Sequence, residues 1–94
     1  MKNFHIAGHL GATPELKTKD DTCWTSLRIA ANGKRTDWFW VKVFGKLAES
    51  IVEHLRKGDG IAVTGSLRTH KYNDQEKVEL IADTATFFGK KGND

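Results

Sequence analysis

Hydrophobic and polar residues alternate along most of the chain, and a period of two is typical of strands with one buried side and one side in water. In the first such segment Phe4, Ile6 and Leu10 fall on one side, and Gly8 on that side is suited to a bend. The alternation predicts five strands, at residues 2–10, 23–31, 37–44, 61–72 and 78–88.

The segments between these strands carry recognisable signals. Asn32-Gly33, between the second and third strands, is a strong hairpin signal. Residues 73–76 predict a tight turn, and residues 11–21, with Gly, Thr, Pro and charged side chains, predict a loop. Neighbouring strands are therefore expected to be antiparallel where the connection is short.

After the third strand the spacing of apolar residues changes to four, which predicts an amphipathic helix over residues 46–57, ended by cations and Gly58. Strands bent by glycine, with a helix between the third and fourth, match a small closed barrel. We predict an all-β domain over residues 1–88, a five-stranded OB-fold barrel with one α-helix between strands 3 and 4. Residues 89–94 are predicted to be a flexible C-terminal end.

The third strand breaks the rule that the solvent-facing side of a strand is polar. Its sequence, DWFWVKVFGK, places Phe39, Val41 and Val43 on the side expected in the core. The opposite side carries three rings and a cation, namely Trp38, Trp40, Lys42 and Phe44. Single-stranded nucleic acid fits such a surface, because bases stack on rings while cations neutralise phosphates.

Further candidate contacts are basic or aromatic residues near turns and element ends: Lys34, Arg35, Lys46, Arg68, His70, Lys71 and Tyr72. An oligomer interface is the alternative explanation for exposed rings. Lys42 and Lys46 favour nucleic acid, because interface cores are depleted of charge. Trp24 shares its side with no cation except Arg28, so a subunit interface is the favoured interpretation for that ring.

Composition adds little to this prediction. The length of 94 residues fits one domain, and 15 Lys and Arg against 12 Asp and Glu give a net charge of +3, which permits a polyanionic partner without requiring one. The single cysteine, Cys23, excludes an intramolecular disulfide and is expected to be a small buried residue in a reducing compartment. No apolar run approaches the ~20 residues of a membrane span, and we expect a cytoplasmic protein.

Catalysis and metal binding are not predicted. The four histidines fall in different elements, without a Cys or His at metal-ligand spacing: His5, His9, His54 and His70. The chain has no Gly-rich phosphate loop of the Walker or dinucleotide type. We therefore expect no enzyme activity, no cofactor and no metal.

Residues 38–74, WFWVKVFGKLAESIVEHLRKGDGIAVTGSLRTHKYND, resemble the central signature of bacterial single-stranded DNA-binding proteins, and GHLGATPE near the N-terminus is similar to a turn of that family. The resemblance implies homotetramers of OB-fold barrels, or else dimers, around which the DNA strand wraps. It implies that Trp38, Phe44 and Tyr72 stack on bases. It makes Arg68 and Lys71 phosphate or base contacts, and Lys46 a phosphate contact.

The sequence departs from this family at four places. Trp40 and His70 stand where the family usually has basic residues, and the loop NGKRT lacks the family's stacking aromatic. The sequence stops at Asp94, without the Gly/Pro/Gln-rich linker and acidic, Phe-ended tip by which the family recruits replication and repair proteins. We therefore do not predict recruitment of these partners. A short form, as in a phage or mobile element, and a shortened chain both fit.

We predict sequence-independent binding of single-stranded DNA, which protects the strand near the nucleoid during replication, recombination or repair. Two alternatives stay open at this point. One is a protein-assembly adaptor of the primosomal type on the same fold. The other is a single-stranded RNA binder, because stacking rings do not distinguish the two sugars.

Overall fold

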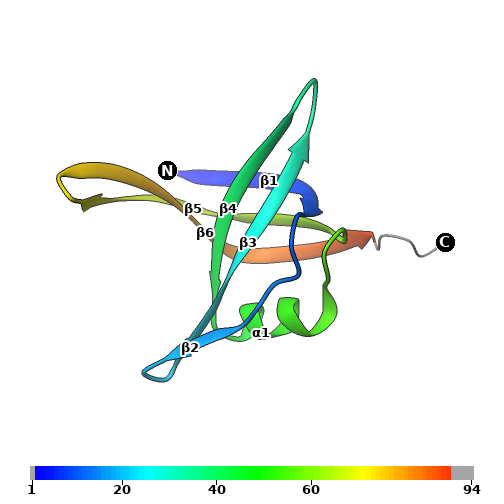
Figure 1. The fold of residues 1–94 in the computed structure, drawn as a ribbon, viewed down its shortest axis with the longest axis horizontal. Helices are drawn as coiled ribbons and strands as arrows, with labels where there is room; N and C mark the ends of the chain where they lie inside the picture. The colour runs from blue at the N-terminus through cyan, green and yellow to red at the C-terminus, as the bar shows by residue number, and fades with distance from the viewer. Residues whose placement is uncertain (1, 90–94) are drawn as a thin grey trace.

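The computed structural model of the chain describes residues 2–89, and within this range it contains six strands and one helix (Figure 1). The strands are β1 (Asn3–Leu10), β2 (Lys17–Lys19), β3 (Thr22–Asn32), β4 (Thr36–Phe44), β5 (Gly60–Tyr72) and β6 (Gln75–Gly89), and the helix α1 (Gly45–His54) lies between β4 and β5.

The five long strands close into a barrel. Their order in the sheet is β1-β5-β6-β4-β3, and β1 pairs again with β3 where His9 meets Ala30 and Leu10 meets Ile29. β4 and β6 are parallel, whereas the other pairs are antiparallel. This arrangement confirms the predicted five-stranded barrel with a helix between its third and fourth strands. β2 is an additional short strand, paired with β3 at the end of the sheet order.

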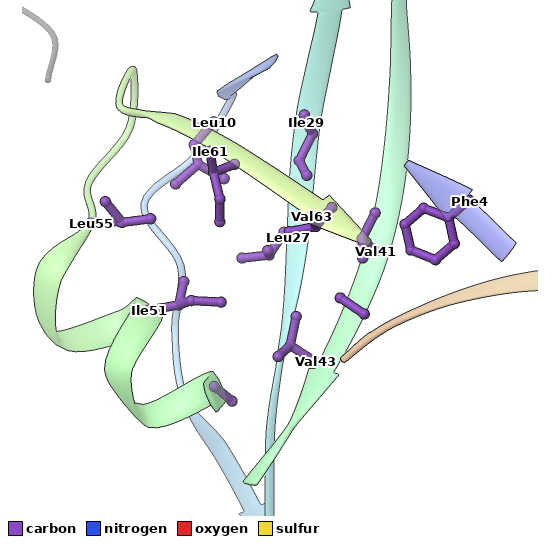
Figure 2. Packing of buried hydrophobic residues seen from close by; sticks show 12 residues of the cluster. Phe4, Leu10, Leu27, Ile29, Val41, Val43, Ile51, Leu55, Ile61 and Val63 are labelled. Carbon is purple, nitrogen blue, oxygen red and sulfur yellow. The ribbon is translucent and has the colours of Figure 1, made fainter. Parts of the chain in front are cut away.

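The core is built from the side of each strand that the alternation marked as apolar. Leu27, Ile29, Val41 and Val43 are at most 1% exposed. Figure 2 shows these side chains in one cluster with Ile51 of α1, so that the helix covers one end of the barrel. Burying each such side chain contributes about 1.5–3 kcal/mol relative to leaving it in water. The residues that the alternation predicts to be buried are therefore those whose burial stabilises the folded state most.

Two glycines allow strands to approach more closely than any side chain would permit. A Cβ atom on Gly65 would lie 1.9 Å from the carbonyl oxygen of Ile81, and one on Gly8 would lie 2.0 Å from that of Ala30. The register of β5 against β6 shifts between Thr64 and Gly65. The bends expected at Gly8 and Gly65 therefore coincide with close crossings of the barrel strands.

The helix is shorter than predicted, because it ends at His54 instead of continuing to residue 57. Leu55 has an extended backbone (φ −115°, ψ 150°), and its side chain is buried in the core. The N–H of Arg56 then donates to Asp59 Oδ2 at 2.9 Å, and its guanidinium donates to the carbonyls of Val52 and Leu55. The last turn of the predicted helix is replaced by this capped, extended segment.

The predicted loop at residues 11–21 was incomplete, because it contains β2. Lys17 of β2 pairs with Trp24 of β3, and the two strands are joined by a turn at Asp20-Asp21, where φ is 50° and 65°. A two-residue turn with two positive φ values is a hairpin turn of the primed type. Residues 17–24 therefore form a hairpin that extends β3.

The last strand is longer than predicted at both ends. Asn73 and Asp74, with φ of 54° and 64°, form a two-residue hairpin turn, so β6 begins at Gln75 instead of residue 78. Gly89, which we expected in the flexible end, is the last residue of β6 and pairs with Gly60. Residues 90–94 of that predicted end lie outside the described residues.

Candidate nucleic-acid interface

The exposed rings of β4 lie on the side of the β3–β4 hairpin that faces away from the core, here called the outer face. The cross-strand pairs on this face are Trp24–Phe44, Ser26–Lys42, Arg28–Trp40 and Ala30–Trp38. Trp38 is 47% exposed, Trp40 63% and Phe44 42%, whereas the alternate residues Val41 and Val43 are fully buried. The structure therefore places these three rings where the alternation predicted.

Trp40 is the most exposed indole on the outer face and lines two shallow hollows. On the β6 side, a hollow of about 170 Å³ is also lined by Lys42, Glu79 and Leu80. On the β2 side, a hollow of about 200 Å³ is also lined by Lys17. Open space next to a ring is what a stacking base requires. The Trp40 side chain therefore has open space on two sides, at a position where the family that the sequence resembles usually has a basic residue.

Trp38 already carries a cation on its ring. The guanidinium carbon of Arg28 lies 4.1 Å from the ring centroid, which is a cation–π contact. A Cβ on Gly11 would lie 2.4 Å from the indole, and the N–H of Gly11 donates to the carbonyl of Arg28. Arg28 and Gly11 therefore hold the indole of Trp38. Arg28 was absent from the predicted site, although its outward side in the second strand was recognised.

Lys42 is paired with a carboxylate of β6. Its Nζ lies 3.3 Å from Glu79 Oε2, and both side chains are about one third exposed (35% and 32%). The parallel pairing of β4 with β6, in which Lys42 meets Ile81, brings the two residues together. Part of the positive charge predicted for phosphate binding is therefore neutralised within the chain.

The β5–β6 hairpin extends beyond the barrel as a two-stranded ribbon, residues 68–78, that is exposed on both faces (Figure 1). On one face Arg68, His70 and Tyr72 pair with Glu79, Lys77 and Gln75. Glu79 lies on the same side of β6 as Ile81, and Ile81 pairs with Lys42 of the outer face. This face of the ribbon therefore continues the outer face of β4. Lys71 lies on the opposite face, across from Glu76.

Lys77 is a second cation that sequence analysis missed. It lies directly opposite His70 on the outer side of the ribbon. If Asn73-Asp74 had been recognised as a two-residue turn, counting equal numbers of residues outward from it along both strands would have placed Lys77 opposite His70.

The remaining predicted residues lie at the two ends of the β3–β4 hairpin. Lys34 is exposed in the connecting turn, next to Arg35, whose Nε lies 3.2 Å from Asp37 Oδ1 on the surface. Lys46 is exposed in the first turn of α1, at the far end of β4. At about 3.3 Å per residue, the nine residues of β4 separate these groups by roughly 26 Å. One phosphate cannot contact the cations at both ends of β4, but those cations can contact two separate phosphates of one bound strand.

Cys23 is partly buried and lies beside a carboxylate, a setting that does not favour the thiolate. Its Sγ lies within 3.5 Å of the carbonyl of Gly45 and 3.4 Å from Glu49 Oε2. Burial, and then the Glu49 carboxylate, raise the pKa of the thiol above its ordinary value, which keeps it protonated at neutral pH.

The described part of the chain contains neither a metal-binding cluster nor a membrane-spanning helix. Among residues 2–89, no group of three or more His, Cys, Asp or Glu side chains is placed to hold a metal ion. The one helix found there is too short to span a membrane.

Comparison with known proteins gives consistent results. The sequence model of the single-strand binding protein family matches residues 1–88. Proteins named single-stranded DNA-binding protein from Xanthomonas axonopodis pv. citri and Xanthomonas campestris pv. campestris are each 35% identical over an alignment of 103 positions that covers 93% of this chain. One from Xylella fastidiosa (strain Temecula1) is 33% identical over 94% of the chain. The chain spans only 57%, 60% and 63% of the lengths of these three relatives.

A solved structure shows the same fold. The second single-stranded DNA-binding protein (SSBb) from Mycobacterium smegmatis matches with a TM-score of 0.77 and 26% sequence identity. The match covers 92% of this chain and 87% of that protein.

Proposed function

The chain belongs to the single-strand binding protein family, and we propose on this basis that it binds single-stranded DNA, largely without regard to base sequence and without catalysing a reaction. The observation that carries this proposal is the outer face, on which three exposed rings stand beside cations on a closed barrel. Its biological role would be to cover and protect unpaired strands in the cytoplasm during replication, recombination or repair.

In this proposal the rings and the cations have separate roles. Trp40, Phe44 and the exposed part of Trp38 stack on bases, each at ~1–3 kcal/mol. Every base has a flat face, so base sequence matters little. Arg68 and Lys77 on the ribbon neutralise phosphates together with Lys46, and Lys42 contributes less because it is paired with Glu79. Tyr72, 66% exposed beside the β5–β6 turn, can stack on a base that leaves the barrel.

Affinity for oligo-dT is expected to depend steeply on salt. If about four phosphates are neutralised, the logarithm of the binding constant falls with a slope of about −2.8 against the logarithm of salt concentration. The affinity then falls about 50-fold between roughly 50 and 200 mM salt. Quenching of tryptophan fluorescence measures it, because the proposed contact rings are the chromophores. Binding that is insensitive to salt, or no quenching at all, would contradict the proposal. Competition with a matched RNA oligomer tests the preference for DNA.

Removing the carboxylate that pairs with Lys42 is expected to strengthen binding. Glu79→Gln releases the Lys42 ammonium group for phosphate, and a surface ion pair of this kind corresponds to about a twofold to fivefold gain in affinity. Glu76→Gln is the matched control, because Glu76 lies on the opposite face of the same ribbon, across from Lys71. Equal gains in the two variants would show that only net charge matters. Fluorescence titration with oligo-dT measures both.

We also propose that the protein forms homo-oligomers, tetramers or else dimers. β1 pairs with β5 along Asn3–His9 but meets β3 only at His9 and Leu10, so most of its second edge is open within the described structure. An open strand edge is suited to pairing with another chain. Sedimentation velocity at several protein concentrations tests this, and a monomer at every concentration would contradict it.

A further inference from the structure

Trp24 has a cation beside it that the sequence did not reveal. On one side it pairs with Phe44 of β4, and on the other with Lys17 of β2. Directly opposed residues on antiparallel strands share a face, with Cβ atoms about 4.5–5.5 Å apart. The interpretation of Trp24 as a subunit contact relied on the scarcity of cations near it. Because β2 was not predicted, Lys17 could not be counted.

The surface around Trp24 is continuous with the outer face described above. The hollow of about 200 Å³ on the β2 side of Trp40 is lined by Lys17 and by Ser26, which lies two residues from Trp24 along β3. Lys19 is exposed on the same side of β2 as Lys17. A DNA strand that runs from Trp40 towards β2 therefore meets Lys17 and the rings of Trp24 and Phe44.

Carboxylates lie near both lysines of β2, but none of those in the described structure is paired with Lys17. Glu15 lines the same hollow as Lys17, and no ion pair joins the two among the described residues. Lys17 is the cation beside Trp24, since Lys19 lines a different hollow, together with Asp20, Asp21, Glu49 and Cys23. Because Cys23 and Trp24 are consecutive in β3, they point to opposite sides of the strand.

We propose that Trp24 and Lys17 extend the stacking surface at Phe44 into a second subsite for single-stranded DNA, which continues the path of the strand from Trp40 to β2. The proposal rests on the function proposed above and lengthens its footprint. An interface between subunits is the competing use of such rings, but interface cores are depleted of charge. Here Lys17 is exposed directly beside Trp24, where it complements phosphate.

The length of the path sets the design of the test. Trp40 and Phe44 are four residues apart on β4, which corresponds to about 13 Å. A stacked strand advances by about 3.4 Å per nucleotide, so about four steps reach from one ring to the other, and a more extended strand needs fewer. An oligo-dT of about 2 nucleotides therefore occupies one subsite, whereas one of about 15 reaches both.

The test compares Trp24→Leu, which keeps an apolar side chain, with Trp24→Phe, which keeps a ring. Trp24→Leu is expected to lower the affinity for the longer oligomer about fivefold or more and for the shorter one less than twofold. Trp24→Phe is expected to stay within about twofold of the original protein on both. Lys17→Gln, an exposed change that does not depend on the core, is expected to reduce the salt slope with the longer oligomer by about 0.7. Circular dichroism verifies that each variant folds.

Three outcomes would overturn the subsite. Unchanged binding of the longer oligomer by Trp24→Leu and Lys17→Gln, while Trp40→Ala weakens it, would refute the subsite and leave the proposed function intact. A change in sedimentation coefficient of Trp24→Leu with unchanged DNA binding would make Trp24 a subunit contact. Failure of the unaltered protein to bind either oligomer would refute the proposed function, and the subsite with it.

Discussion

Removing both indoles of β4 in a Trp38→Ala/Trp40→Ala variant is expected to lower the affinity for oligo-dT by about 2–6 kcal/mol, or roughly 30-fold to 10⁴-fold, because each stacked base contributes ~1–3 kcal/mol. The change leaves the core intact, since both side chains are substantially exposed, at 47% and 63%. A filter-binding or anisotropy assay with labelled oligo-dT measures the loss, because it does not depend on tryptophan fluorescence. The Trp→Phe double variant, which keeps two flat rings, is the control.

The two single variants are expected to differ. Trp40→Ala should cost more than Trp38→Ala, because Trp40 adjoins hollows on both of its sides, whereas Arg28 already covers a face of Trp38 at 4.1 Å. The opposite order would show that the guanidinium of Arg28 leaves the ring when DNA binds. It would also favour the base-stacking role that resemblance to the family assigns to Trp38. No loss in the double variant would contradict the outer face as the binding surface.

Replacing Gly65 with alanine is expected to destabilise the fold by about 3 kcal/mol or more. The new Cβ would lie 1.9 Å from the carbonyl oxygen of Ile81 and 2.7 Å from the Cα of Ala82. Both are backbone atoms, so the β5–β6 pairing itself would have to shift. For a domain of this size, such a loss lowers the melting temperature by at least about 12 °C. Thermal unfolding followed by circular dichroism measures it.

Gly33→Ala is the matched control for this change. The nearest atom to a Cβ at Gly33 is the carbonyl oxygen of Arg35, at 3.9 Å, and the backbone of Gly33 lies outside the left-handed region. We expect a change within about 1 kcal/mol in either direction. A similar loss of stability in both variants would show that the close crossing at Gly65 is not the cause.

The long strands were predictable because their signal is local. Alternation of apolar and polar residues records which side of a strand is buried, and Leu27, Ile29, Val41 and Val43 are indeed in the core. β2 gave no such signal, because all three of its residues, Lys17–Lys19, are exposed. Its pairing with β3 depends on a turn at Asp20-Asp21 that has no glycine. The end of α1 was also misplaced, because burial of an extended Leu55 decided it.

The rings of the candidate site were predictable for the same reason, since Trp38, Trp40 and Phe44 are separated by even numbers of residues on one strand. The partners of these side chains were not. Arg28 lies over Trp38, and Glu79 pairs with Lys42, only because particular strands are neighbours in a particular register.

The sequence by itself determined which residues face water and which enter the core, because a strand has a period of two and water excludes apolar side chains along its whole length. It also determined that rings and cations share one side of β4. Only the tertiary structure decided which charges those rings meet. Pairing between strands is non-local, and a shift of one residue in register would send every side chain of a strand to the other face. The Lys42–Glu79 pair, the Arg28–Trp38 contact and the Lys17–Trp24 pair all depend on that register.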